Sequence, residues 1–290
     1  MAKPQIFCVV GATASGKTAY AIHLAKELGG EVVSCDSMQI YRDMNIGTAK
    51  PTKEEMQGIP HHMIDIVDPW QNYSVAEFVT DANKCIQEIL AKGKTPILCG
   101  GTGLYVDSIL NGISFTQEAR DDAYREELIQ LAAEQGNHAV HDLLRASDPK
   151  AAEEIHPNNV KRVIRTLEII KTSGKTKAEF DLAARVEPLY DATVYGMERE
   201  REELYQRIDL RVDLMMEQGL LNEVESLVNQ GIPMTATSMQ AIGYKELISF
   251  LNGECSLEEA VETIKRESRR YAKRQLTWFR RNPNIIWRSV

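Results

Sequence analysis

Short apolar runs, each ending at a glycine or a small polar residue, recur along the chain. Ile6–Val10 is one such run and stops at Gly11, and Glu31–Ser34, Thr95–Cys99 and Asp191–Met197 repeat the pattern. Strands of a parallel sheet are buried on both faces, so they read as near-continuous apolar segments rather than as an alternation. The pattern predicts an α/β protein whose ligands bind at the carboxyl ends of the strands.

Helical segments separate these predicted strands. Thr18–Leu28 has a helix-forming composition and stops at Gly29 and Gly30, which are good helix terminators. Ser74 and Glu77 have the spacing of a capping box at the start of a second helix. The apolar positions that follow them recur at helical spacing: Val75, Phe78, Val79, Ala82 and Ile86.

A long stretch in the middle of the chain differs from the rest. From about Thr116 to Ala184 it is charged and helical in composition, with few runs of β-branched residues. This predicts an inserted α-helical lobe, after which Asp191–Met197 returns the chain to the sheet. We therefore predict a core domain of residues 1–115 and 185–290, with helices at its C-terminal end, and an inserted helical domain of residues 116–184.

Charge is unevenly distributed. The net charge is −8, but Lys265 to Val290 hold nine Lys/Arg and one acidic residue, a balance of +8, against −16 for the remainder. Such asymmetry predicts that the C-terminal segment meets a polyanion.

The composition also excludes several classes of protein. Hydrophobic residues make up 43% of the chain, enough for a sizeable core. The five cysteines form no CxxC pair, which argues against a disulfide framework or a zinc site and suits a reducing compartment. No segment approaches the roughly 20 apolar residues that span a bilayer, and no coiled-coil seam is present. We expect a cytoplasmic monomer that does not associate with membranes.

The strongest motif follows the first predicted strand. Residues 11–18 read GATASGKT and match GxxxxGK[ST] in full, between a strand and a helix. The backbone N–H groups of such a loop point at phosphate oxygens, the lysine neutralises them, and the final hydroxyl can hold Mg²⁺. The predicted cradle for a diphosphate or triphosphate is Gly11, Ala12, Thr13, Ala14, Ser15, Gly16, Lys17 and Thr18, with Thr18 as the Mg²⁺ ligand. The fold class is therefore a P-loop NTPase-like parallel sheet flanked by helices, with the inserted helical lobe.

The usual partners of a nucleotide-hydrolysing P-loop are poorly represented. There is no run of four apolar residues ending in an acidic pair, and no NKxD motif. The best carboxylate is Asp36, which follows the strand candidate Glu31–Ser34 and would lie beside the P-loop. We predict a catalytic role for Asp36; a turn residue, or one that contacts magnesium through water, is the alternative.

Several further motifs carry a resemblance to a known family. Residues 35–51 (CDSMQIYRDMNIGTAKP), together with GATASGKT, 61–69 (HHMIDIVDP) and 99–105 (CGGTGLY), closely resemble the tRNA dimethylallyltransferase family. The resemblance continues through 155–175, 240–246 (QAIGYKE) and 272–281 (AKRQLTWFRR) and so covers nearly the whole chain in order. Ala12 stands where many members have proline, and the zinc finger of some eukaryotic members is absent.

The resemblance implies a reaction. The exocyclic amine of the adenosine 3′ of the anticodon in tRNA would attack C1 of dimethylallyl diphosphate, and diphosphate would leave. Asp36 would act as the general base, and Thr102 would hydrogen-bond the bridging oxygen of the donor. Mg²⁺ and Lys17 would stabilise the charge on the leaving group.

Binding of the two substrates is implied as well. The pocket for the unstacked adenine would comprise Asp36, Ser37, Met38, Gln39 and Thr102. Arg211, and with it Arg207, could reach the donor diphosphate, although simple helix solubility is an equal alternative for both.

The expected tRNA contacts are spread over the chain. Arg269–Arg281 interleaves basic residues with Tyr271, Trp278 and Phe279, so cations could meet phosphates while rings stack on bases; a solvated amphipathic helix is the alternative. The predicted tRNA-binding residues of this segment are Lys273, Arg274, Gln275, Leu276, Thr277, Trp278, Phe279 and Arg280. The others are Arg125, Lys161, Arg162, Val163, Ile164, Arg165, Gln240, Ala241, Ile242, Gly243, Tyr244 and Lys245.

Two other interpretations of the P-loop stay open. A small-molecule or nucleoside kinase would use it to bind ATP, and an RNA-binding module would use it as a nucleotide switch. His61 and His62 lie near Asp65 and Asp68. Adjacent residues of an extended segment point to opposite faces, so we expect structural or RNA-proximal roles rather than a metal site.

Overall fold

The computed structural model describes residues 2–113, 121–184 and 186–290. The chain forms two compact units, one of Met1–Leu110 with Pro188–Val290 and the other of Asn111–Glu187. The domain boundaries predicted from the sequence, 115/116 and 184/185, involve residues 115, 116 and 185, which lie outside the described residues.

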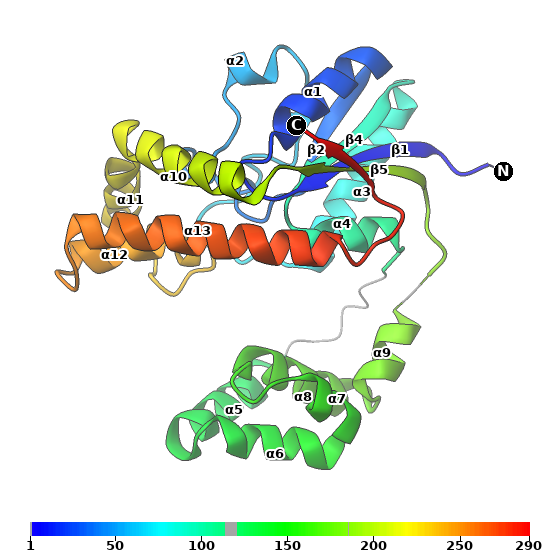
Figure 1. The fold of residues 1–290 in the computed structure, drawn as a ribbon. Coiled ribbons are helices and arrows are strands. Elements are labelled where there is room, and N and C mark those ends of the chain that lie inside the picture. The colour runs from blue at the N-terminus through cyan, green and yellow to red at the C-terminus, as the bar shows by residue number, and fades with distance from the viewer. Residues whose placement is uncertain (1, 114–120, 185) are drawn as a thin grey trace. The chain divides into compact units, whose positions relative to one another are not determined.

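A six-stranded sheet forms the centre of the first unit (Figure 1). Its order is β3-β2-β4-β1-β5-β6, and every neighbouring pair is parallel. The strands are β1 (Gln5–Gly11), β2 (Gly30–Ser34), β3 (His61–His62), β4 (Thr95–Gly100), β5 (Asp191–Glu198) and β6 (Ile286–Ser289). Because β1, β2 and β4 are neighbours, the loops that leave their carboxyl ends meet at one edge of the sheet. The parallel α/β fold predicted from the sequence is confirmed.

Some helices of the first unit pack on the sheet, and others pack with the loop after β2 in a separate cluster. The helices of this unit are α1 (Lys17–Leu28), α2 (Lys53–Met56), α3 (Val75–Ala91), α4 (Gly103–Leu110), α10 (Arg201–Glu217), α11 (Leu220–Asn229), the 3₁₀ turn η1 (Ser238–Gln240), α12 (Tyr244–Leu251) and α13 (Leu257–Phe279). The predicted capping box of α3 is present: Ser74 Oγ accepts the N–H of Glu77, whose carboxylate accepts the N–H of Ser74.

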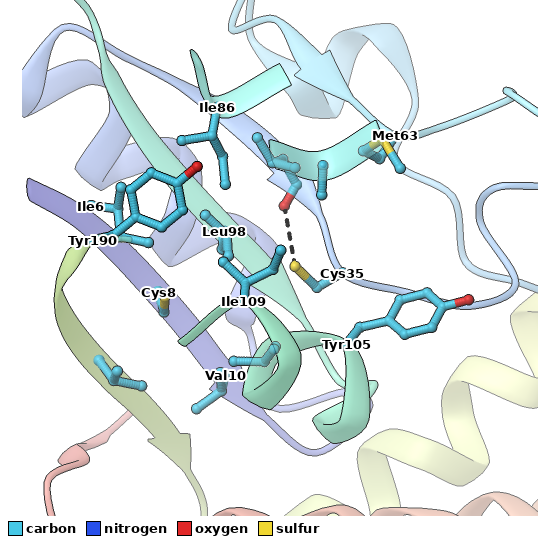
Figure 2. Close-up of a cluster of buried hydrophobic side chains, with 14 of the residues drawn as sticks. Ile6, Cys8, Val10, Cys35, Met63, Ile86, Leu98, Tyr105, Ile109 and Tyr190 are labelled. Carbon is cyan, nitrogen blue, oxygen red and sulfur yellow. Dashed lines mark hydrogen bonds between the residues drawn. The ribbon is translucent and has the colours of Figure 1, made fainter. Parts of the chain in front are cut away.

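Alternate residues of β1 pack on opposite faces of the sheet. Ile6, Cys8 and Val10 face α3 and α4, where they join a buried cluster that contains Ile86 (Figure 2). Val9 faces α1 on the other side. Each of these side chains is fully buried, which for a residue of this size stabilises the fold by about 1.5–3 kcal/mol.

A separate apolar cluster joins the loop after β2 to the C-terminal helices. Ile40, Tyr41 and Met44 pack against Leu220 of α11 and Tyr244 of α12. The loop that carries Asp36 is therefore braced by helices nearly two hundred residues away in sequence.

The second unit is a bundle of short helices around a small apolar core. They are α5 (Asp122–Gln135), α6 (Asn137–Ser147), α7 (Pro149–Glu154), α8 (Val160–Ser173) and α9 (Lys177–Ala183). Leu128, Val140, Leu144 and Leu167 are buried between them. Within the described ranges of both units, no helix is long and apolar enough to cross a bilayer.

Candidate active site

The P-loop curls tightly at the end of β1. Gly11 has φ +143°, and a Cβ there would come within 2.5 Å of the Met197 carbonyl oxygen of β5. Gly16 has φ +96° and precedes α1 in the left-handed region. Both positions therefore require glycine, as the motif predicts.

Other elements hold the P-loop from outside. Thr13 N–H donates to Gln275 Oε1 of α13 at 2.8 Å, and Arg207 Nε of α10 donates to the Ala14 carbonyl at 3.1 Å. Gln275 Nε2 donates to the Gly101 carbonyl at 3.0 Å. Gln275 thus ties the P-loop to the turn after β4, and with 5% exposure it has no free surface for RNA.

Lys17 extends into the space beside the P-loop. Its Nζ donates to the Ala12 carbonyl at 2.5 Å. Burial lowers the pKa of Lys17 to about 8, and the neighbouring Arg211 acts in the same direction. A phosphate anion beside Nζ would favour the charged form, so the site is built to gain from anion binding.

Asp36 follows β2 and is held in a turn. Its Oδ1 accepts the N–H of Met38 at 2.9 Å and the N–H of Gln39 at 3.4 Å, and Oδ2 takes no part in these bonds. Burial raises the pKa of Asp36, while the Met38 N–H and the Lys17 charge limit the rise. A carboxylate with a raised pKa is a better proton acceptor near neutral pH.

Thr102 lies in the glycine turn after β4 and contacts the turn after β2. Its Oγ1 accepts the N–H of Ser37 at 3.1 Å and donates to Ser37 Oγ at 3.3 Å. A Cβ at Gly100 would clash with the Cys35 carbonyl, so glycine is what allows the two turns to touch. The structure thus brings Asp36 and Thr102 together at the edge of the sheet, where sequence reasoning placed them.

Two cavities meet beside these turns. The phosphate cavity, of about 350 Å³, is lined by the P-loop residues Thr13, Ala14, Gly16, Lys17 and Thr18, and also by Gln39 and Arg207. The second cavity, of about 340 Å³, has a mixed lining with several apolar side chains and three basic ones: Met38, Ile208, Val212 and Ile242, and Arg211, Lys245 and Arg274. The residues common to both are Thr13, Asp36, Thr48, Ala49, Arg211 and Tyr271.

Arg211 and Tyr271 complete this junction. Arg211 lines both cavities, and its guanidinium is of the kind that binds phosphate oxygens through two N–H groups. Burial, and then Asp36, raise the pKa of Tyr271 to about 12, while its hydrogen bonds with Thr102 and Gln275 act against the rise. Sequence reasoning took Tyr271 for an RNA-stacking residue. Its place four residues before Gln275, on the same helix face, is the signal that could have found it.

The QAIGYK motif divides between cavity and core. Gln240, Ala241, Ile242, Gly243 and Lys245 line the second cavity. Tyr244 does not: it is 0% exposed, and its hydroxyl donates to Glu223 at 2.6 Å. The Tyr244 ring lies in the apolar core, so any tRNA contact of this motif would come from its other side chains or its backbone, and the tRNA-binding role of the motif stays a prediction.

Helix α13 presents only part of its predicted RNA surface. Lys273, Arg274, Thr277 and Arg280 are exposed, whereas Phe279 is 2% exposed. Leu276 packs against the buried side chains of the P-loop residues Ala12 and Ala14.

Trp278 is half-buried, and both its N–H and one ring face are engaged. Nε1 donates to Asp107 at 2.8 Å, and the Arg281 guanidinium lies 4.1 Å from the ring centroid. The buried Phe279 ring has no face open to a base, whereas Trp278 is covered by Arg281 on one face, and base stacking on Trp278 stays a prediction.

The predicted basic face of α8 is similarly reduced. Lys161 and Arg162 are exposed, but Val163 and Ile164 belong to the core of the second unit. Arg165 donates to the Glu168 carboxylate at 2.5 Å.

Arg125 makes two bonds to the same carboxylate, of 2.7 and 2.6 Å. Burial alone would raise the pKa of Glu168, which is 0% exposed, but the bonds from Arg125 and Arg165 lower it to about 2. Arg125 and Arg165 both neutralise the buried Glu168 carboxylate. An RNA phosphate would have to compete with Glu168 for these two guanidinium groups.

The paired histidines separate as expected for an extended segment. His62 Nε2 bonds Glu31 at 2.7 Å, while His61 lines the phosphate cavity with its Nδ1 on the Ile59 carbonyl at 2.9 Å. Among the described residues, no group of three or more His, Cys, Asp or Glu side chains could hold a metal ion. The cavity position of His61 was not anticipated.

Comparisons with known proteins agree with this geometry. Residues 39–282 match the IPP transferase family model. A tRNA dimethylallyltransferase of Bacillus anthracis is 53% identical over 290 residues, which cover 100% of this chain and 92% of that protein. One of Bacillus licheniformis is 52% identical over 285 residues, covering 98% and 90%.

Solved structures give the same picture. The full-length tRNA isopentenylpyrophosphate transferase of Bacillus halodurans is similar, with a TM-score of 0.75 and 49% identity, covering 99% of this chain and 90% of that one. A eukaryotic dimethylallyltransferase acting on tRNA has a TM-score of 0.84 and 31% identity, covering 99% and 74%. The family that the motifs indicated is thus confirmed: the chain belongs to the IPP transferase family.

Proposed function

We propose that this protein is a tRNA dimethylallyltransferase. It transfers the dimethylallyl group of dimethylallyl diphosphate to the exocyclic amine of the adenosine 3′ of the anticodon, with release of diphosphate. The observation that carries this proposal is the position of Asp36, on the lining shared by a phosphate-binding cavity and a second cavity with several apolar side chains. A base at that junction lies between a donor in one cavity and an acceptor in the other.

The phosphate cavity receives the donor. The P-loop N–H groups, Lys17 and Arg211 hold the diphosphate oxygens and neutralise their charge. The exposed Thr18 hydroxyl fits as a ligand for Mg²⁺, which commonly binds through few protein oxygens together with substrate phosphates. When bound, Mg²⁺ would supply further charge neutralisation on the leaving group.

The second cavity receives the adenosine. Lys245 and Arg274 at its lining would contact nearby phosphates of the anticodon loop, while Ser37 and Met38 border the base. Gln39 belongs to the donor side instead, because its amide bonds the Thr48 and Ala49 carbonyls and it lines the phosphate cavity. A tRNA substrate supports a cytoplasmic location for the protein.

Bond formation takes place at the junction. The amine nitrogen bonds C1 of the donor as the C1–O bond breaks, and diphosphate leaves with the electron pair. Asp36 takes the proton that the amine loses, and Thr102 Oγ1 turns from Ser37 to donate to the bridging oxygen. Every atom of the donor is then accounted for in the prenylated adenosine and the released diphosphate.

Incubation of the purified protein with an anticodon stem-loop RNA, Mg²⁺ and labelled dimethylallyl diphosphate tests the proposal. Label should enter the RNA, and should not enter a matched stem-loop whose adenosine is replaced by a purine lacking the exocyclic amine. Absence of label from both RNAs, or phosphate transfer from ATP to a small-molecule acceptor, would refute the proposed dimethylallyl transfer.

A further inference from the structure

The segment Asn45–Ala49, called the wall below, borders both cavities through its last residues. Gly47, Thr48 and Ala49 line the second cavity, and Thr48 and Ala49 also line the phosphate cavity. This segment lies between β2 and α2 and is a turn, closed by bonds from the Ala49 N–H to the Ile46 carbonyl and from the Lys50 N–H to the Asn45 carbonyl. These local bonds shape the turn but do not attach it to the rest of the protein. Whatever holds it sets the position of a wall at the point where the two cavities meet.

A single carboxylate on α11 holds one end of this wall. Glu223 Oε2 accepts the N–H groups of Asn45 and Ile46, both at 2.8 Å, and Oε1 accepts the N–H of Gly47 at 3.1 Å. Tyr244 donates its hydroxyl to the same Oε1 at 2.6 Å. Four donors converge on one carboxylate, which when ionised is purely an acceptor.

The wall is also held by packing against the Tyr244 ring. A Cβ at Gly47 would come within 2.5 Å of the Tyr244 ring, so the backbone lies directly on the ring. The ring itself is fully buried. Glycine at position 47 is thus explained by contact with an aromatic ring rather than by a strained backbone angle.

The other end of the wall is attached from the donor side. Gln39 Nε2 donates to the carbonyls of Thr48 and Ala49, both at 3.2 Å, and Thr48 Oγ1 donates to the Met44 carbonyl at 2.6 Å. Glu223 makes none of the bonds to Asp36, whose Oδ1 accepts the N–H groups of Met38 and Gln39; Gln39 is what links the Asp36 turn to the wall. Loss of the Glu223 contacts would free Asn45, Ile46 and Gly47 while Asp36 keeps both of its bonds.

We propose that Glu223 is a positioning residue for the donor: through the backbone N–H groups of Asn45, Ile46 and Gly47 it holds the turn whose next residues, Thr48 and Ala49, line the phosphate cavity. The inference rests on the proposed function, because it takes the diphosphate of the donor as the ligand; its test measures pyrophosphate binding and does not require prenyl transfer. In Glu223→Gln, an NH₂ group replaces one of the two carboxylate oxygens and cannot accept a hydrogen bond. If it replaces Oε1, the bond to the Gly47 N–H is lost; if it replaces Oε2, the bonds to the Asn45 and Ile46 N–H groups are lost. Hydrogen bonds to a charged group stabilise by roughly 1.5–3 kcal/mol, which corresponds to tenfold or more in affinity.

The test compares Glu223→Gln with Glu225→Gln, a matched change two residues along the same helix. The first measurement is amide hydrogen exchange at Asn45, Ile46 and Gly47; the second is the affinity for inorganic pyrophosphate with Mg²⁺. We expect Glu223→Gln to speed exchange at all three amides and to weaken pyrophosphate binding by about tenfold. Donor KM should rise in parallel with little change in the pH dependence of kcat, and Glu225→Gln should behave as wild type.

Tyr244→Phe provides a second variant that keeps the ring and the carboxylate and removes one hydrogen bond. It should shift pyrophosphate affinity in the same direction by a smaller factor. If Glu223→Gln or Tyr244→Phe lowers Tm but leaves pyrophosphate affinity and donor KM at wild-type values, Glu223 only stabilises the fold and the inference is overturned. Pyrophosphate binding needs neither RNA nor prenyl transfer, so a failure of the proposed function would be recognised separately.

Discussion

The Oε1 atom of Gln275 accepts the backbone N–H of Thr13 at 2.8 Å, joining two residues 262 positions apart in the sequence. The same amide donates to the Gly101 carbonyl, so α13 locks the P-loop to the turn that carries Thr102. The P-loop of this protein is thus shaped by its C-terminal helix as well as by its own glycines. The helix predicted to bind RNA also builds the donor site.

Gln275→Ala should weaken donor binding. The change leaves the Thr13 N–H and the Gly101 carbonyl without their partner, and an unsatisfied buried group costs about 1–3 kcal/mol. We expect a lower Tm and a weaker affinity for inorganic pyrophosphate, measured by calorimetry. Thr277→Ala, on the exposed face of the same helix, is the control. Equal pyrophosphate affinities in the two variants would show that Gln275 does not shape the cradle.

Asp36→Asn should abolish most of the chemistry and little of the binding. A positioned general base contributes about 10²–10⁴ in rate, and asparagine keeps the acceptor for the Met38 N–H. Single-turnover transfer should slow by that factor while pyrophosphate and RNA affinities stay within about twofold.

The pH dependence gives an independent check on Asp36. Burial raises its pKa, and the base works only when deprotonated, so the wild-type rate should fall as the pH drops through a value above the ordinary range of an aspartate. The residual activity of Asp36→Asn should lack this acid limb. An unchanged acid limb in the variant would assign it to another group.

Sequence patterns sufficed to assemble the candidate active site because the positions of its residues are set by local features. Gly11, Gly16 and Lys17 lie in one continuous motif, and Asp36 and Thr102 follow strands whose apolar runs are plain. In a parallel sheet, the ends of neighbouring strands meet, so local assignments sufficed to bring these residues together. The four longer strands were found for the same reason.

The failures come from tertiary contacts that no local pattern records. β3 is only His61–His62, and β6 is Ile286–Ser289; each is a strand because an edge of the sheet pairs with it. Tyr244 and Phe279 stand in segments predicted to bind tRNA, yet both side chains are buried, because on an amphipathic helix one face packs while the other is solvated. Motif membership alone could not separate the two faces.

Acid should destabilise the helical second unit through Glu168. The bonds from Arg125 and Arg165 lower the pKa of Glu168 to about 2, below its ordinary value of 4.5. A depressed carboxylate pKa gives stability that is present above the unfolded pKa and is lost as pH falls from about 4.5 through about 2. By linkage this contribution is on the order of 3 kcal/mol at most.

Hydrogen exchange of the amides in α5 and α8, followed from pH 6 to pH 3, measures this loss of stability after correction for intrinsic rates. Wild type should lose protection as the pH falls, and Glu168→Gln should have low protection that varies little over the same range. Parallel pH profiles for the two proteins would rule out Glu168 as the source.

RNA binding should depend more on the basic side chains of α13 that form no ion pair within the described residues than on those that do. Arg269 forms an ion pair with Asp209, and Arg270 with Glu267. Lys273 and Arg274 are exposed, and Arg274 lines the second cavity. Each lost phosphate contact should reduce the slope of log affinity against log salt by about 0.7–0.9.

The experiment therefore compares two double variants in stem-loop RNA binding across a salt series. Lys273→Ala with Arg274→Ala should flatten the slope by about 1.4–1.8, because two phosphate contacts are removed. Arg269→Ala with Arg270→Ala should change it less, since Asp209 and Glu267 already neutralise those cations in the free protein. Pyrophosphate affinity should stay at the wild-type value in both, because neither pair lies in the cradle. A larger slope change for Arg269 and Arg270 would mean that RNA displaces their carboxylate partners and that the exposed pair lies outside the contact surface.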